Sequence, residues 1–541
     1  MSPAARSRPP GVTLAEFRSG AAASRIENRT ALVAAAEELL SGAYVHLRQK
    51  QARYGVDPVR QLRMLRTRAA GMTDEAFRRE LTAVFSGLRD RHTGYLAPTP
   101  FAGTTAVLPF LVEAYRTGGG AWRHVVSKVS AWCPAAEGFV PGAEVTHWNG
   151  VPIQRAVERL AAAQRGATDD ARTARGLAAL VSRSLEHSAF PDEEWVTVSY
   201  RGPGGRRSAT FNWRVIPTPP ARPDGDRQDG DGQDGAAAAD PGLVLAEDPG
   251  GQAVQAARRE LYAPGAAPAG WLPTSRPAVL SARPLDRRTG YLRIWSFADA
   301  DALAVRDEAC RLVAALPPGG LVVDVRGNPG GHLPTAERLL QVLTRRPVIP
   351  AGFSPASTEL TLAMSREESS ELRRWKPSLA AAVGTGEAYA QALPLTPVAE
   401  ANDLDEELRY RGPVVLVVDA LTYSAADVFA AGFQDNGLGP VLGTGRTTGA
   451  GGANVWTADQ VLQRAGEEHL RSGVPAGSGT FTLAFRRATR GGENAGLPLE
   501  DVGVTADEVH WPTRADLTAG NRDLLRAAVR LLRAGSGGPD R

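Results

Sequence analysis

The second half of the chain alternates short apolar runs with longer mixed segments. Unbroken apolar runs predict buried strands over residues 289–295, 320–325, 413–418 and 440–443. The intervening segments predict helices over residues 300–315, 335–344 and 425–433. Because a strand that is apolar on both faces must be covered on both, this alternation predicts an α/β sheet with helices on each side.

The first half of the chain has a different texture. Ala- and Leu-rich segments between about residues 30 and 88 predict helices, with a break at 55–58 and a helix cap at Thr73. From residue 105 to 215, short β-rich runs, among them 106–112 and 209–215, flank one helical stretch at 156–163. Residues 216–242 hold prolines, aspartates and glycines with almost nothing apolar to bury, which predicts a disordered linker.

Length and charge narrow the classes of function. At 541 residues the chain exceeds one ordinary hydrophobic core, so we expect about two to four domains. The formal charge is +3, from 62 basic and 59 acidic side chains, which argues against a dedicated nucleic-acid binder. Two cysteines cannot form a disulfide framework, and no apolar run approaches the roughly 20 residues of a membrane helix. Since the N-terminus lacks the pattern of a secretory signal, we expect a cytoplasmic location without stable membrane insertion.

Two predicted strand-to-helix turns are candidates for chemistry, because reactive groups gather at the carboxyl ends of strands in such sheets. Ser424 enters the helix 425–433, where main-chain N–H groups and the helix dipole favour the negative charge that a nucleophile creates. An N-cap serine is the alternative. The second turn, 324–332, contains Gly330 and Gly331 but not the spacing of a nucleotide P-loop. It fits an oxyanion hole or an ordinary glycine-rich connection.

Several motifs in order resemble one family. They are Gly-Tyr-Leu-Arg-Ile-Trp-Ser-Phe at 290–297, Asp-Val-Arg-Gly-Asn-Pro-Gly-Gly at 324–331, and Ser-Ala-Ala-Asp-Val-Phe-Ala-Ala at 424–431 with Gln-Asp-Asn-Gly at 434–437. This series resembles the core of the tail-specific (C-terminal processing) peptidases and of the tricorn protease, and residues 140–153 resemble the end of a PDZ domain. The resemblance implies a catalytic sheet of the ClpP/crotonase-like type. It also implies that Ser424 is the nucleophile, with Ala425 and either Gly330 or Gly331 as oxyanion donors.

The family divides according to its catalytic base. Tail-specific enzymes use a lysine, but Gly449 holds that position, 25 residues after Ser424, and no lysine follows Lys376. Arg446 cannot replace it, because a guanidinium does not lose its proton near neutral pH. The tricorn-like branch uses a histidine, and residues 89–95 resemble its Asp-x-His-Thr motif, which implies that His92 is the base. A solvated or hydrogen-bonded loop histidine is the alternative.

A glutamate completes the site in the tricorn-like branch. Residues 497–507 resemble the branch's Ile-Glu-Asn-x-Gly-Val-x-Pro-Asp segment, which places Glu500 where that glutamate stands. Asp501 replaces the asparagine, and a polar insertion around 463–478 lengthens the separation from Ser424. A solvated surface carboxylate is the alternative reading of Glu500. Asp435 is another acid near Ser424, and its matching position in the family is structural.

Together these features predict a multidomain α/β serine peptidase. The expected parts are an N-terminal helical region with the His92 motif (1–104), a PDZ-like β-rich domain (105–215), a disordered linker (216–245), an α/β catalytic domain (246–513) and a C-terminal helix and tail (514–541). We expect an acyl-enzyme mechanism without cofactor or metal. The expected partner is a polypeptide substrate, on an extended or C-terminal segment, and not nucleic acid; a homo-oligomer stays open. The alternatives are a catalytically degenerate peptide-binding protein and an esterase-type acyl hydrolase.

Overall fold

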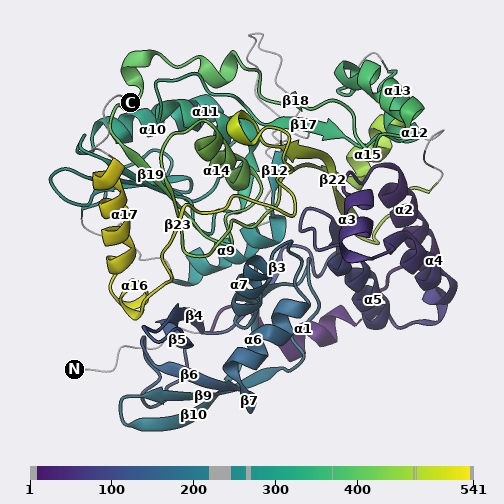
Figure 1. The fold of residues 1–541 in the computed structure, drawn as a ribbon. Coiled ribbons are helices and arrows are strands. Elements are labelled where there is room, and N and C mark those ends of the chain that lie inside the picture. The colour runs from purple at the N-terminus through teal and green to yellow at the C-terminus, as the bar shows by residue number, and fades with distance from the viewer. Residues whose placement is uncertain are drawn as a thin grey trace, which may run out of the picture.

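The structure is a computed structural model that describes residues 9–22, 24–218, 245–262, 270–367, 370–466, 470 and 472–535. The N-terminal helices lie on one side, a β-rich region lies at the bottom, and the main α/β sheet lies above it (Figure 1). Within the described residues, no helix is long and apolar enough to cross a membrane.

The central sheet of the second half has six strands in the order β13-β14-β15-β19-β20-β23. Strand β13 is antiparallel to β14, and the other neighbours are parallel. The strands are β13 (Leu280–Pro284), β14 (Gly290–Ile294), β15 (Leu321–Asp324), β19 (Val414–Val418), β20 (Val441–Gly443) and β23 (Glu508–Val509). The helices around them are α10 (Ala302–Ala314), α11 (Leu333–Val342), α14 (Ala425–Asp435) and α17 (Arg522–Gly535). The strands and helices predicted from the apolar runs are thus confirmed.

Alternate residues of these strands face two different cores. Val323 and Leu416 join the large core that also contains residues of α10, α11 and α14. Their neighbours Val322 and Val415 pack instead in a smaller core with residues of α17, such as Leu524. This period of two explains why the strands are apolar throughout, since both faces of the sheet are buried.

A second sheet in this half has the order β18-β17-β22-β2, and β21 also pairs with β22. Its strands are β2 (Gly94–Leu96), β17 (Gly352–Pro355), β18 (Leu393–Pro394), β21 (Ala453–Thr457) and β22 (Thr480–Thr489). The remaining helices here are α12 (Glu359–Met364), α13 (Lys376–Thr385), α15 (Ala458–Ala465) and α16 (Arg514–Thr518). Strand β2 comes from the N-terminal region, so this sheet joins that region to the second half of the chain.

The N-terminal region is helical as predicted. Its helices are α1 (Leu14–Ala21), α2 (Arg29–Gly42), α3 (Leu47–Tyr54), α4 (Pro58–Arg68) and α5 (Asp74–Gly87). The chain breaks between α3 and α4 at the expected turn, where Gly55 has a φ of +64°. Thr73 caps α5 by accepting a hydrogen bond from the Ala76 N–H, as predicted.

The β-rich region contains two sheets. One has the order β10-β9-β6-β5-β4, with β7 paired to β6, and the other has the order β1-β11-β3-β8. The strands are β1 (Val12–Thr13), β3 (Thr104–Val107), β4 (Phe110–Arg116), β5 (Trp122–Val129), β6 (Glu144–Trp148), β7 (Val151–Pro152), β8 (Ser182–Ser184), β9 (Trp195–Gly202), β10 (Gly205–Asn212) and β11 (Arg214–Pro217). Helices α6 (Ile153–Ala162) and α7 (Asp169–Ala179) accompany them.

Three expectations for this part of the chain need correction. The predicted run 106–112 is two strands in different sheets, divided before β4, and the run 209–215 likewise divides into β10 and β11. Helix α7 was not predicted. The linker is shorter at both ends than 216–245, because Ile216 and Pro217 belong to β11 and Leu245 begins β12 (Leu245–Glu247). The expected disorder within 219–244 lies outside the described residues.

Candidate active site

Ser424 lies on the turn between β19 and α14, in a backbone conformation that an ordinary helix cap does not need. Its φ is +65° and its ψ is −124°, and its side chain makes no capping hydrogen bond. Holding a non-glycine residue in such a region costs on the order of 1–3 kcal/mol, and such strain clusters at active sites. Strained strand-to-helix turns also present the nucleophile in other serine hydrolases. The geometry therefore favours a reactive serine over a capping one.

The side chain of Ser424 meets that of His92, 332 residues away in the sequence. The distance from His92 Nε2 to Ser424 Oγ is 2.6 Å. Both side chains are 0% exposed. A hydrogen bond of this length is the contact through which an imidazole can take a hydroxyl proton.

Strand β22 explains how two such distant residues meet. Gly94 of β2 lies opposite Thr482 of β22, and the N–H of Ala484 donates to Thr93 Oγ1 at 3.0 Å. These contacts fix the loop that carries His92. On its other side β22 pairs with β21, which follows the loop whose Gly451 carbonyl accepts the Ser424 N–H at 3.0 Å. One strand thus supports both halves of the pair.

His92 is uncharged near neutral pH. Burial lowers the pKa of His92 to about 4, against the carboxylate of Asp90, which raises it. Asp90 accepts the His92 main-chain N–H at 2.8 Å, and its Oδ1 lies 4.0 Å from His92 Nδ1. Tyr423 Oη lies nearer, 3.4 Å from Nδ1. The neutral imidazole can therefore accept a proton at Nε2 while oxygen atoms surround Nδ1.

Glu500 is buried beside His92 and is not a surface carboxylate. A nitrogen of His92 and carboxylate oxygens of Asp90 and Glu500 all lie within 4.8 Å of one another. Glu500 Oε1 accepts a hydrogen bond from Lys50 Nζ at 2.6 Å, and the same ammonium donates to Asp501 Oδ1 at 2.5 Å. Within the described residues, Glu500 Oε2 has no hydrogen-bond partner. The structure thus brings Glu500 to the pair and adds a lysine that the sequence motifs did not indicate.

Lys50 serves as a counter-ion and not as a second base. Burial alone would lower its pKa, but the Glu500 and Asp501 carboxylates outweigh burial and raise the pKa of Lys50. Burial and the carboxylates of Asp90 and Asp501 raise the pKa of Glu500, against Lys50, which lowers it. The cluster therefore contains three acidic side chains, Asp90, Glu500 and Asp501, and one ammonium, which Glu500 and Asp501 share.

The expected oxyanion donors lie beside Ser424. Strand β16 (Gly330–His332) passes so close to Phe297 that a Cβ on Gly331 would meet its carbonyl carbon at 2.1 Å. The Gly330 N–H already donates to Asn328 Oδ1 at 2.9 Å, so it is not free to bind a substrate oxygen. Gly331 lies opposite Ala246 in the antiparallel pair of β12 and β16, two residues from the hydrogen bond of the Asp248 N–H to the Pro329 carbonyl, so this ladder also engages the Gly331 N–H. Ala425 remains as the candidate from the predicted set that lies next to Ser424.

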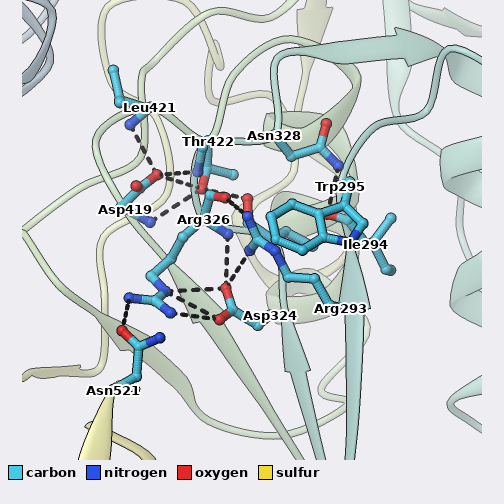
Figure 2. A network of polar contacts seen from close by, with 12 residues as sticks. Arg293, Ile294, Trp295, Asp324, Arg326, Asn328, Asp419, Leu421, Thr422 and Asn521 are labelled. Carbon is cyan, nitrogen blue, oxygen red and sulfur yellow. Dashed lines mark hydrogen bonds and ion pairs between the residues drawn. The ribbon is translucent and has the colours of Figure 1, made fainter. Parts of the chain in front are cut away.

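A buried polar network holds the oxyanion turn against the nucleophile turn (Figure 2). Asp419 Oδ1 accepts the Gly327 N–H at 2.8 Å and the Leu421 N–H at 3.0 Å, so one carboxylate joins the two turns. Thr422 Oγ1 donates to the Val325 carbonyl at 3.1 Å. Asp324 is held by Arg326; burial would raise the pKa of Asp324, but Arg293 and Arg326 outweigh burial and lower it. This rigid pairing fixes Ser424 relative to Gly331.

The group formed by Asp90, His92 and Glu500 has a spacing that a metal ion could bridge. Lys50 Nζ, however, lies 2.6 Å from Glu500 and already supplies a positive charge there. Both Asp90 oxygens also accept hydrogen bonds, from the His92 N–H and from Thr93 Oγ1. With Lys50 as the counter-ion and both Asp90 oxygens engaged, these residues fit a proton-transfer site better than a metal centre.

Sequence reasoning missed Lys50, Asp90 and Tyr423 as parts of the site. One signal was available for Lys50, because lysine is rare among the 62 basic residues and Lys50 lies in a helix of the region that carries His92. Asp90 precedes His92 in the quoted Asp-x-His-Thr motif, and Tyr423 precedes Ser424. Their contacts with Nδ1 depend on the fold.

Part of the chain matches a known protein family, and its fold is similar to that of solved structures. Residues 288–459 match the model of peptidase family S41. The crystal structure of mature CPAF is similar over 95% of this chain and 99% of its own, with a TM-score of 0.66 and 17% identity. Mature CPAF complexed with lactacystin gives a TM-score of 0.63 at 18% identity, over 94% of this chain and 98% of its own. At this level of identity the likeness to CPAF is one of fold. The match of residues 288–459 to the peptidase family S41 model identifies the chain as a serine-type peptidase.

Proposed function

We propose that Ser424 and His92 cleave peptide bonds through an acyl-enzyme intermediate. The observation that carries this proposal is the 2.6 Å contact between His92 Nε2 and Ser424 Oγ. His92 takes the hydroxyl proton as Ser424 Oγ attacks the carbonyl carbon. The imidazolium then returns the proton to the leaving amine. Water, activated by the neutral His92, hydrolyses the ester bond to Ser424.

The tetrahedral intermediate needs donors for its negative oxygen. We assign this role to the N–H of Ala425, which begins α14, since the Gly330 N–H donates to Asn328 and Gly331 is paired with Ala246 of β12. Loss of one such donor costs about 2.7–4 kcal/mol in the barrier. The strained turn at Ser424 supports the assignment, because it keeps the following N–H beside the hydroxyl.

Glu500 is proposed as the third member of the site. Its free Oε2, with Asp90, gives the cluster around Lys50 an excess of negative charge. An imidazolium on His92 would offset that excess, so these carboxylates would stabilise the proton-transfer step. The span of up to 4.8 Å among the three groups is one that a single bridging water can cover.

Extended protein segments are the proposed substrates. Strand β12 pairs in antiparallel fashion with β16 and places Ala246 opposite Gly331. Because β12 itself occupies this edge, a substrate that adds here as a strand would take the place of β12. Whether the sheet of β4 to β10 acts as a PDZ domain, and whether the chain is cytoplasmic or a homo-oligomer, stay predictions.

Two other functions compete with a peptidase. A degenerate peptide-binding protein would need no contact between His92 and Ser424, and the observed hydrogen bond counts against it. An esterase would use the same groups, so only substrates separate the two. A matched panel of peptide amides and p-nitrophenyl esters tests this: hydrolysis of esters alone would contradict the peptidase proposal.

The nucleophile is tested by labelling with diisopropyl fluorophosphate and mapping the adduct by mass spectrometry. We expect slow labelling of Ser424, because its side chain is buried, and no adduct in Ser424→Ala. Since a CPAF structure contains lactacystin, we also propose lactacystin as a competitor of this labelling. An adduct on another serine would contradict the assignment.

A further inference from the structure

A large cavity of about 1710 Å³ lies beside the Ser424–His92 pair and is unusually rich in positive charge. Twelve arginine or lysine side chains line it, against three acidic ones, Glu113, Asp248 and Asp419. The whole chain is nearly balanced, at +3, so the imbalance is a property of this cavity. A concave surface of one sign focuses its field on ligands of the opposite sign.

Three of the arginines stand nearest the reactive groups. Arg91 precedes His92, and its N–H donates to Tyr423 Oη at 3.3 Å. The guanidinium of Arg175, on α7, lies over the Tyr423 ring at 4.8 Å from its centroid. Arg165 donates to the carbonyl of Thr93 at 2.9 Å. The cluster therefore borders the residues on either side of the proposed catalytic contact.

Asp248 is the carboxylate that contacts two of these arginines, Arg91 and Arg175, and its charge also acts on Arg165. Its Oδ2 accepts a hydrogen bond from Arg91 Nε and lies 4.0 Å from Arg175 Nη2. Its Oδ1 accepts the Gly251 N–H at 2.8 Å. Within the described residues, Nη1 of Arg175 has no hydrogen-bond partner, although Arg175 is only 5% exposed. Asp248 alone therefore does not satisfy all the buried N–H donors of these arginines.

Neighbouring groups record the same excess of positive charge. Burial and Arg91 lower the pKa of Arg165 to about 10, against Asp248, which raises it. Burial, Arg165 and Arg91 lower the pKa of His187 to about 3. A buried guanidinium N–H without a partner is costly, and a second carboxylate would satisfy the Nη1 of Arg175.

Asp248 reaches this position from the strand that lies on the oxyanion turn. It directly follows β12, and its N–H donates to the Pro329 carbonyl at 3.0 Å, which continues the pairing of β12 with β16. A structural cap for helix α9 (Pro249–Tyr262) explains the bond to Gly251. It does not explain why three arginines gather around one carboxylate at the edge of the active site.

We propose that Arg91, Arg165 and Arg175 form a binding site for a carboxylate group of the peptide substrate, and that Asp248 occupies this site when no substrate is bound. The ligand is an acidic side chain or a free C-terminal carboxylate, which share this chemistry. The inference rests on the proposed function, because it names the group that the same active site selects.

The test measures binding to Ser424→Ala by calorimetry, so that turnover plays no part. Three pentapeptides are compared: Ac-Ala-Ala-Gln-Ala-Ala-NH2, the same peptide with Glu in place of Gln, and the Gln peptide with a free C-terminus. We expect at least one carboxylate-bearing peptide to bind about tenfold or more tightly than the neutral one, since charge-assisted hydrogen bonds to arginine are strong. The Glu arm and the free-terminus arm identify the source of the carboxylate.

Two variants in the Ser424→Ala background complete the design. Arg175→Gln should reduce the preference to less than about threefold, because it removes a guanidinium and keeps a polar side chain. Asp248→Asn keeps an acceptor for the Gly251 N–H but removes the carboxylate that competes with the substrate for the arginines. Carboxylate-bearing peptides should therefore bind at least about threefold more tightly to this variant, whereas binding of the neutral peptide should not change. Equal or undetectable binding of all three peptides, or an unchanged preference in both variants, overturns the site. Labelling of Ser424 is measured separately, so failure of this site and failure of the nucleophile are distinguishable.

Discussion

Two buried charge clusters flank the Ser424–His92 pair, and they have opposite balance. On one side three carboxylates, Asp90, Glu500 and Asp501, share the ammonium of Lys50. On the other side Arg91, Arg165 and Arg175 gather around Asp248. The first cluster has a deficit of positive charge next to the histidine that must become positive, and the second has a deficit of negative charge next to a cavity. Buried charge serves proton transfer in one and ligand binding in the other.

The largest expected effect comes from removing the base between the two clusters. His92→Gln keeps a polar side chain but cannot take the Ser424 proton, so its rate of labelling by diisopropyl fluorophosphate should fall about 100- to 10,000-fold. The rate constants are compared by intact mass spectrometry at matched protein concentration. A fall of less than about threefold would show that another group activates Ser424.

The stability of the fold should depend strongly on Lys50, the single cation of the carboxylate-rich cluster. Lys50→Met keeps an aliphatic chain but leaves buried carboxylates without a counter-charge, which should lower the free energy of unfolding by about 3–5 kcal/mol. The matched control is Lys376→Met, at an exposed position, which should change it by less than about 0.5 kcal/mol. Urea denaturation measures both, and equal effects would mean that Lys50 is not the counter-ion of this cluster.

The pH dependence of the labelling rate shows whether burial or the neighbouring carboxylates dominate the pKa of His92. Since burial lowers the pKa of His92 to about 4, the imidazole is neutral and active above that pH and protonated below it. The labelling rate should stay constant from pH 8 to 6 and fall about tenfold per pH unit well below pH 4, with circular dichroism as the control for folding. A midpoint near 6.5 would indicate an ordinary, exposed imidazole.

The smallest expected effect is that of salt concentration, which should change peptide binding at the arginine cluster but not the labelling rate at the Ser424–His92 pair. Raising NaCl from 50 to 500 mM should weaken binding of a carboxylate-bearing peptide by about threefold to tenfold, because added salt screens attraction to an open, charged cavity. The neutral peptide should change by less than about twofold, and so should the labelling rate at the enclosed pair. Equal salt dependence for both peptides would argue against a role for the arginines.

The sequence was sufficient to predict those site residues that directly follow a predicted strand. Ser424 and the turn at Gly330 and Gly331 follow buried apolar strands, so their place at one sheet edge could be predicted. His92 and Glu500 required ordered motifs, because β22 brings them together across hundreds of residues. Lys50 and Arg175 could not be predicted as members of buried clusters, since a charge on an amphipathic helix ordinarily faces water. Only the fold shows which charges are buried and which partners they lack.

The account rests most directly on Ser424 as a nucleophile activated by His92. Prolonged labelling with diisopropyl fluorophosphate, followed by peptide mapping, tests this in one measurement on the full chain. We predict a single adduct on Ser424 that forms slowly in the parent protein and does not form in Ser424→Ala. No adduct on Ser424, or an adduct that persists in Ser424→Ala, would contradict it.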